Sequence, residues 1–115
     1  WMNQVFPNPN LTSINFLNNN NLESIDISSQ GLNSAYSLSF SNNPVLNTLD
    51  ISDNHLECFD ISNMPNLENF DCSSNLLEQL KNRNGNYLNM NVDALSNNFS
   101  SMKIIFNDSS MSYSE

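Results

Sequence analysis

Apolar residues recur along this chain in a ten-residue pattern that occurs three times. Each copy has apolar residues at positions one, four and six, an amide at position nine, and a leucine at position eleven. The copies are 22–32 "LESIDISSQGL", 46–56 "LNTLDISDNHL" and 67–77 "LENFDCSSNLL". Apolar and polar residues alternate from position three to position seven. This alternation predicts a short strand with one buried face.

A second pattern of eleven residues fills the stretches between these copies. Its apolar residues fall within 11–16, 38–40 and 56–61, and polar segments such as "SNNP" and "SNMPN" follow them. Asn and Pro favour turns, so this half predicts a second short strand on the opposite face. Together the halves give a period of 21 residues. The longer interval from Leu22 to Leu46 fits this period if 32–34 is an insertion and Ala35 takes the leucine position.

A single unit of this kind cannot bury its own apolar residues. We therefore predict that successive units stack as coils of a solenoid with a continuous core and little or no helix. The amide at position nine is expected to bond backbone groups of the neighbouring coil, at a net gain of about 1 kcal/mol for each bond. Asn54 and Asn75 are the predicted members of this structural asparagine ladder, and Gln30 is a looser one.

The composition narrows the possible partners. Three Lys or Arg residues stand against twelve Asp or Glu residues, and the net charge is −9. Nucleic-acid backbones and anionic membrane surfaces need clustered cations, so neither is an expected partner. Asn and Ser make up more than a third of the chain, but the periodic apolar residues argue against disorder. The start at Trp1 rather than Met indicates a piece of a longer chain.

The phrases "LDIS", "FDIS" and "FDCS" in 21-residue pairs resemble leucine-rich repeats. The resemblance is to a bacterial subclass, as in secreted surface proteins exported by the type IX secretion system. Segment 80–115 is similar to the closing segment of such arrays, through Asn84-Gly85-Asn86, 90–93 and 97–98. It departs from the family at Phe99, where Pro is usual, and at Lys103, where Cys is usual.

This resemblance implies a mainly β fold, a leucine-rich repeat solenoid of about five 21-residue turns with short parallel strands. The solenoid is expected to span 1–106, with 88–106 as a C-terminal capping turn. Residues 107–115 are expected to form a polar tail that leads to a missing downstream domain.

A column of acidic residues is predicted on the outer face of one sheet, because stacked coils lie about 4.8 Å apart. The candidate ligand face consists of the aspartate at position five and the serine at position seven of each ten-residue copy. These residues are Asp26, Asp50, Asp71, Ser28, Ser52 and Ser73. In the other half of each unit the outward residues are Asn15, Ser39, Asp60 and Lys81.

Two interpretations of the acidic column remain open. Asp26, Asp50 and Asp71 could share a calcium ion, or they could receive sugar hydroxyls or basic groups of a partner. Alternatively, each carboxylate bonds a nearby Ser, Thr or Asn on a solvated surface, since repulsion between neighbours in water is only about 0.9 kcal/mol. We favour the solvated surface and expect no other metal or cofactor.

Catalysis is not expected. The acidic column repeats identically, whereas acid–base catalysis needs two carboxyls in different environments. The sequence contains no nucleophile elbow, metal-binding histidine pair or phosphate-binding loop. His55 is expected at the surface. Cys58 should point outwards and Cys72 into the core, which makes a disulfide between them improbable.

The sequence therefore favours a non-enzymatic binding or adhesion module of a secreted or cell-surface bacterial protein, which presents a polar face to protein or glycan. The alternative is a structural spacer or filament component in a larger secreted protein whose active domain lies elsewhere. Aromatic residues clustered on one face would favour the binding module, and a uniformly polar surface would favour the spacer.

Overall fold

The computed structural model describes residues 12–83, 85 and 89–97, and the strand backbone of 103–106. This part contains short strands and no helix, which confirms the mainly β fold class. The strands are β1 (Ser13–Asn15), β2 (Ser24–Asp26), β3 (Ser37–Ser39), β4 (Thr48–Asp50), β5 (Cys58–Asp60), β6 (Asn69–Asp71), β7 (Gln79–Asn82), β8 (Asn91–Asp93) and β9 (Lys103–Phe106).

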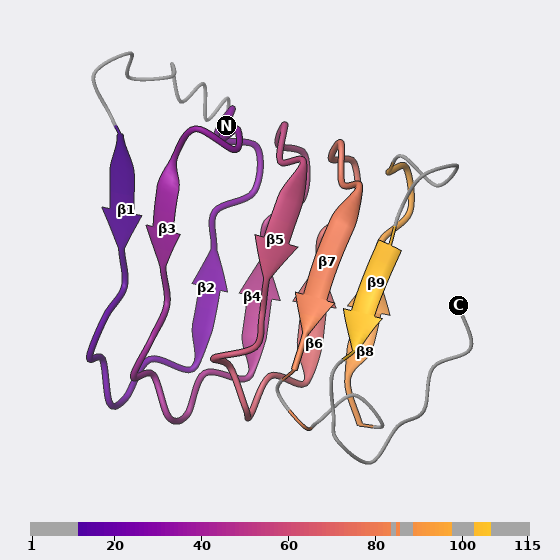
Figure 1. The fold of residues 1–115 in the computed structure, drawn as a ribbon. Helices are drawn as coiled ribbons and strands as arrows, with labels where there is room; N and C mark the ends of the chain where they lie inside the picture. Colours follow the sequence, from indigo (N-terminus) through magenta and orange to yellow (C-terminus); the bar gives the residue numbers. More distant parts are fainter. Residues whose placement is uncertain (1–11, 84, 86–88, 98–102, 107–115) are drawn as a thin grey trace, which may run out of the picture.

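Successive strands alternate between two opposite faces of the molecule (Figure 1). One face carries a continuous sheet in the order β2-β4-β6-β8. The other face carries β1-β3 and β5-β7-β9 as two separate sheets. Every pair of strands is parallel. The chain is therefore a β-solenoid of about four turns, close to the predicted number.

The strand register gives the length of each coil. The partners Thr48 and Asn69 lie 21 residues apart, as do Cys58 and Gln79. Ser24 pairs with Thr48 at a separation of 24 residues. The predicted 21-residue period thus holds in the middle of the described coils, and the coil before it is three residues longer.

The core lies between the two faces and contains the periodic apolar residues. Side chains that are less than 2% exposed include Leu46, Leu49, Ile51, Ile61, Leu67, Cys72, Leu77 and Leu80. A row of aromatic rings crosses the same core. Phe40 stacks on Phe16 at 5.5 Å, and Phe59 meets Phe40 at 5.7 Å and Phe70 at 5.8 Å, measured between ring centroids. Because Phe59 lies in β5 and Phe70 in β6, this row joins the two faces.

The insertion lies after Leu32, not at Leu32 as the spacing suggested. Leu32 is 2% exposed, and its amide donates to Asn54 Oδ1 just as the Leu56 amide donates to Asn75 Oδ1. Ala35 is exposed. The prediction that Ala35 takes the leucine position is wrong, because leucine buries more apolar surface at the core site than alanine does.

Some predictions concern residues outside the described part. These are the first eleven residues of the predicted solenoid, the polar tail 107–115, and much of the capping turn 88–106, of which β8 and the β9 backbone are described. Among the described residues, no helix could cross a membrane.

Candidate functional site

The predicted acidic column lies along the continuous sheet. Asp26 pairs with Asp50 in the register of β2 and β4, and Asp50 pairs with Asp71 in β4 and β6. The column continues to Asp93, which pairs with Asp71. Sequence reasoning did not assign Asp93 to the column, although the phrase "NVDALS" places an aspartate between two apolar residues there.

The first three carboxylates of the column, at Asp26, Asp50 and Asp71, each bond the serine two residues further on. Asp50 Oδ1 accepts the Ser52 amide at 2.9 Å and the Ser52 hydroxyl at 2.6 Å. The same pair of bonds forms at Asp26 with Ser28 and at Asp71 with Ser73. Asp93 accepts only a backbone amide, from Leu95 at 3.1 Å. The column is thus a row of local turns, each closed by its own carboxylate.

The hydrogen bonds favour the charged form of Asp26. The Ser28 hydroxyl, followed by the Ser28 amide, lowers the pKa of Asp26 below its ordinary value, against a smaller opposing effect of burial. In the described part of the chain, no three His, Cys, Asp or Glu side chains converge where they could hold a metal ion. One oxygen of each of Asp26, Asp50 and Asp71 already accepts bonds from its own coil, which agrees with the favoured interpretation of a solvated surface. Calcium binding stays the alternative interpretation.

Asn54 joins two coils through its side-chain amide. Its Nδ2 donates to the carbonyls of Ile27 in the preceding coil, at 3.0 Å, and Ile51 in its own coil, at 2.9 Å. Its Oδ1 accepts the amides of Gln30 at 3.1 Å and Leu32 at 2.9 Å. The side chain is only 4% exposed, so these bonds satisfy backbone groups that water does not reach.

Asn75 makes the same connection one coil later. It donates to the carbonyls of Ile51 at 2.9 Å and Cys72 at 3.2 Å. Gln30 occupies the equivalent position but donates to the Ser28 carbonyl of its own coil, at 2.7 Å. Its side chain therefore caps a turn of its own coil, and the coil to which it would bridge lies outside the described residues.

Two further asparagines belong to this ladder and were missed. Asn97 donates to the Cys72 carbonyl at 2.8 Å. Asn43 lies at the opposite corner of the solenoid and donates to the carbonyls of Phe16 and Phe40, both at 2.6 Å. The signal was present in the second pattern, where "SNNP" places an asparagine three residues after a buried aromatic.

The second face of the solenoid is interrupted between β3 and β5. No Cα atom of β3 lies within 8 Å of a Cα atom of β5, whereas paired strands lie about 4.8 Å apart. Figure 1 shows this wider spacing beside the regular spacing of β5 and β7. The opposite sheet continues through the same coils without a break. The solenoid is therefore open on one face only.

The β3 edge presents an unpaired peptide group to this gap. In a parallel ladder, alternate residues bond to neighbours on opposite sides. Ser37 donates its amide to Thr12 at 3.0 Å, on the β1 side. Ser39 accepts the Phe16 amide at 2.8 Å on that same side. The N–H and C=O of Leu38 consequently point towards β5.

The β5 edge faces the same gap with two more peptide groups. Ile61 donates its amide to the Lys81 carbonyl at 2.9 Å, on the β7 side. By the same alternation, Phe59 bonds to β7 and the peptide groups of Cys58 and Asp60 point towards β3. Among the described residues, no backbone hydrogen bond joins β3 to β5.

Two sequence features coincide with the break. Thirteen residues separate the starts of β2 and β3, but ten separate those of β4 and β5. In the longer connection, Ser34 Oγ accepts the Glu57 amide at 2.9 Å, whereas in the next coil the matching amide bonds to a backbone carbonyl. At the other end of the gap, Met64 lies one 21-residue period after Asn43, which joins the two preceding coils through its side-chain amide. The thioether of Met64 cannot donate such a hydrogen bond.

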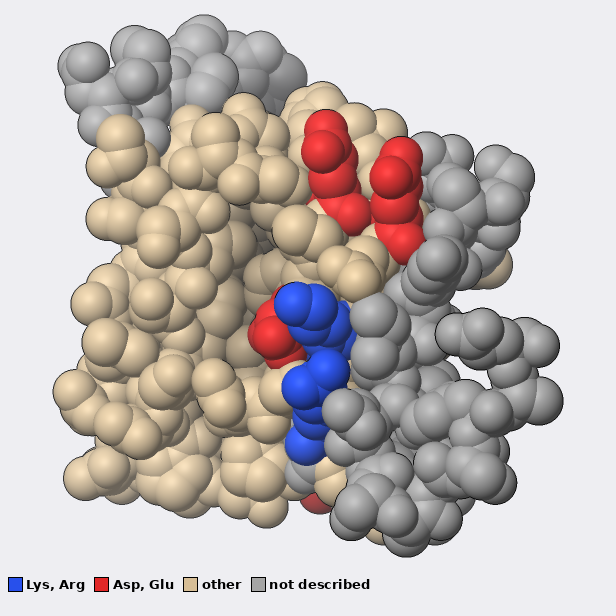
Figure 2. Space-filling view, in the orientation of Figure 1, with Lys and Arg blue, Asp and Glu red and all other residues tan. Residues whose placement is uncertain are grey.

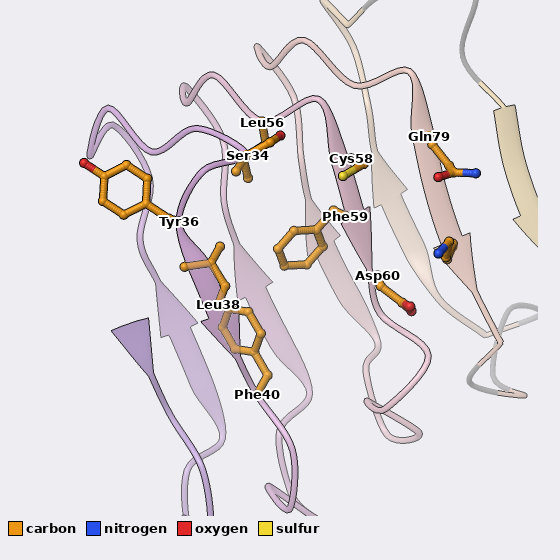
Figure 3. Close-up of a pocket in the computed structure, with 10 residues that line it drawn as sticks. Ser34, Tyr36, Leu38, Phe40, Leu56, Cys58, Phe59, Asp60 and Gln79 are labelled. Carbon is orange, nitrogen blue, oxygen red and sulfur yellow. The ribbon is translucent and has the colours of Figure 1, made fainter. Parts of the chain in front are cut away.

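A groove with a volume of about 210 Å³ lies along the gap. Its lining residues come from three coils and are Ser34, Tyr36, Leu38, Phe40, Leu56, Cys58, Phe59, Asp60, Gln79 and Lys81. Figure 3 shows the Phe59 ring directed towards Leu38 and Phe40 across the space between β3 and β5. The contact between the two rings closes the floor, so the groove is apolar below and polar at its rim.

Charge is unevenly distributed over this face. Figure 2 shows acidic and basic side chains gathered over β5 and β7, and uncharged residues over β1 and β3. Asp60 and Lys81 are direct partners in the strand register. One side of the groove therefore carries both signs of charge, and the other side carries hydroxyls and aromatic surface.

The remaining polar candidates lie apart from one another. His55 is exposed, and its backbone amide donates to the Leu32 carbonyl at 2.7 Å. Cys58 is a free, exposed thiol at the groove, and Cys72 is a free thiol in the core, as predicted.

Burial, and to a smaller degree the charges of Asp71 and Asp93, raise the pKa of Cys72 to about 12. This thiol is therefore uncharged at neutral pH.

Comparison with known proteins adds no relative. No family model, curated protein or solved structure matches this chain.

Proposed function

We propose that the chain is a bacterial leucine-rich repeat solenoid of the 21-residue subclass. The support is the phrase L-x-x-L-x-L-x-x-N-x-L in 46–56 and 67–77, together with the asparagine bridges that this phrase positions. A secreted or cell-surface location goes with this proposal, through the resemblance to proteins of the type IX secretion system.

We further propose that this chain is a non-enzymatic binding module for protein or glycan. The observation that carries this proposal is the groove between β3 and β5. The solenoid satisfies its backbone with regular strands and buried asparagines, yet here it leaves strand edges unpaired above an apolar floor. Ligand sites combine apolar surface with a few convergent polar groups, and this groove has both.

The alternative is a structural spacer in a larger protein. It is favoured by the acidic column, where each carboxylate next to a serine closes a turn in its own coil. A surface satisfied in this way needs no ligand. The two proposals therefore assign the same solenoid different roles, one that depends on the groove and one that depends only on the stacked coils.

NMR titration of the ¹⁵N-labelled chain separates the two. The probes are a short neutral peptide and a series of neutral oligosaccharides, each added to millimolar concentration. Saturable shifts of the Leu38, Cys58 and Gln79 amides support the binding module at the groove. Shifts confined to Asp26, Asp50 and Asp71 support binding at the acidic column instead. If no probe moves any of these amides, the binding proposal is rejected and the spacer remains.

A further inference from the structure

The gap between β3 and β5 is wider than the spacing of two paired strands. Paired strands lie about 4.8 Å apart, so an inserted strand requires its two neighbours to stand about 9.6 Å apart. The closest Cα atoms of β3 and β5 are more than 8 Å apart. The gap is thus too wide for direct pairing and compatible with one intervening strand.

The hydrogen-bonding groups on both sides fit such an occupant. Leu38 presents an N–H and a C=O from β3, and Cys58 and Asp60 present theirs from β5. A peptide strand offers alternating donors and acceptors on both of its edges. Because β3 and β5 run in the same direction (Figure 1), a parallel strand completes the ladder that the rest of this face already follows.

The groove also sets the side chains that the occupant needs. Its floor contains Leu38, Phe40 and Phe59, so an inward-facing residue must be apolar. Successive side chains of a strand point to opposite faces, so every second residue faces solvent. The chain carries a net charge of −9, which disfavours both an acidic peptide and a second copy of this chain.

We infer that the groove binds an extended, neutral or basic peptide segment of another protein, which inserts between β3 and β5 as an added parallel strand. This inference rests on the proposed binding function and specifies its ligand. Strand addition is an established mode of peptide recognition, in which backbone bonds supply affinity and side-chain pockets supply selectivity.

The probe is a capped nine-residue peptide, KAYSLSFSK, which places the sequence of segment 35–41 between two lysines. It alternates apolar and polar residues and carries a positive charge. We expect saturable binding that shifts the Leu38 and Cys58 amides and slows the reaction of the Cys58 thiol with a disulfide reagent by about tenfold or more at saturation. Two control peptides have the same sequence, with every second backbone nitrogen methylated. In one, the methyl groups lie along one edge of the strand, and in the other they lie along the opposite edge. Both methylated forms lose N–H donors but keep every side chain, so we expect at least one of them to bind about tenfold more weakly.

A matched pair of protein variants tests the backbone contact at Cys58. Cys58→Ala removes the thiol and keeps the amide, so we expect the dissociation constant, measured by fluorescence anisotropy of the labelled peptide, to stay within about twofold. Cys58→Pro removes the N–H that faces the gap and leaves the Phe59 bonds to β7, since proline is tolerated at a strand edge. We expect about tenfold weaker binding for this variant. The melting temperature of Cys58→Pro, and its amide NMR spectrum recorded without peptide, show whether the fold is kept.

The outcomes separate this inference from the proposed function. Equal binding of the unmodified and both methylated peptides overturns strand insertion, as does equal binding of Cys58→Pro and Cys58→Ala. If an oligosaccharide shifts the groove amides and the peptide does not, strand insertion is rejected and the binding module stands. If neither probe binds, both proposals are rejected.

Discussion

At the scale of single residues, buried asparagines satisfy backbone N–H and C=O groups and join adjacent coils, as backbone pairing does in a sheet. Asn54 and Asn75 each donate to carbonyls of two coils and accept a backbone amide through Oδ1. They lie at corners where the chain leaves one strand and turns towards the next. Because these corners are buried, a residue that cannot both donate and accept leaves several backbone groups without partners.

Asn54→Ala is expected to lower the free energy of unfolding by about 3 kcal/mol or more, because three carbonyls and two amides lose a partner in a buried site. The matched control is Asn63→Ala, at an exposed turn position, where we expect a change within about 0.5 kcal/mol. Urea denaturation followed by circular dichroism gives both values. Similar losses in the two variants would contradict the structural role of Asn54.

Cys72 gives the chain an alkaline instability. Its pKa is raised to about 12 in the folded state, against the ordinary value of 9.0 for an exposed thiol. The neutral thiol therefore contributes stability that is complete below pH 9.0 and is lost progressively as the pH rises towards about 12. Over this window the unfolding free energy is expected to fall by up to about 1.4 kcal/mol per pH unit from this group.

Comparing the wild type with Cys72→Ala isolates this contribution, because all other groups titrate in both proteins. The variant should be less stable at pH 7, since it leaves a small cavity, but should lose stability less steeply between pH 9 and pH 11. Parallel pH profiles for the two proteins would show that the thiol does not titrate differently on unfolding.

At the scale of elements, the strands are too short to be stable alone and depend on their neighbours. Most of the described strands have three residues. The continuous sheet gives β4 a partner on each side, whereas β3 and β5 each have a partner on one side only. The gap should therefore be visible as a local difference in protection within otherwise equivalent strands.

Native-state hydrogen exchange measures this difference. Leu38 and Leu49 occupy the same position in β3 and β4, and both amides point towards the following coil. The Leu49 amide faces β6 in a paired ladder, but the Leu38 amide faces the gap. We expect Leu38 to exchange about 100-fold faster or more, because local exposure does not require unfolding of the sheet.

Cys58 and Asn69 provide a second comparison, for amides that face the preceding coil. Asn69 donates to the Asn47 carbonyl at 2.9 Å, whereas Cys58 has no backbone partner among the described residues. Equal protection at both pairs of positions would mean that β3 and β5 are joined in solution, and the peptide-insertion proposal would then lose its basis.

At the scale of the whole molecule, the two faces of the solenoid offer different surfaces. One face carries the regular acidic column of the continuous sheet. The other carries the groove, with mixed charge beside it (Figure 2). The net charge of −9 acts over the entire molecule and favours neutral or cationic ligands.

Calcium tests whether the acidic column is more than a solvated surface. Weak extracellular calcium sites have dissociation constants of about 1 mM, so about 10 mM calcium would raise the melting temperature by several degrees if a site existed. We expect no rise, because Asp26, Asp50 and Asp71 each direct an oxygen to a serine of the same coil. Magnesium at the same concentration controls for general charge screening. A rise specific to calcium would assign the column an ion.

Much of the fold was predictable because it depends on local repetition. Leu49 is buried within β4, and Ile51 and Cys72 are buried directly after β4 and β6. These positions alternate with polar residues, and this alternation is visible in the sequence. The acidic column follows from the same alternation, once equal periods place equivalent residues in register. Asn43 was overlooked because its repeat unit varies, with Met64 at the same position one coil later.

The sequence by itself determined a stack of short parallel strands with a shared apolar core, because each coil repeats nearly the same local pattern. Only the tertiary structure decided how the solenoid responds where that pattern fails. Extra residues between Leu32 and β3 could have formed an external loop that left the sheet intact. Instead β3 and β5 are separated, because strand pairing depends on how two coils meet in space and not on the sequence of either coil alone.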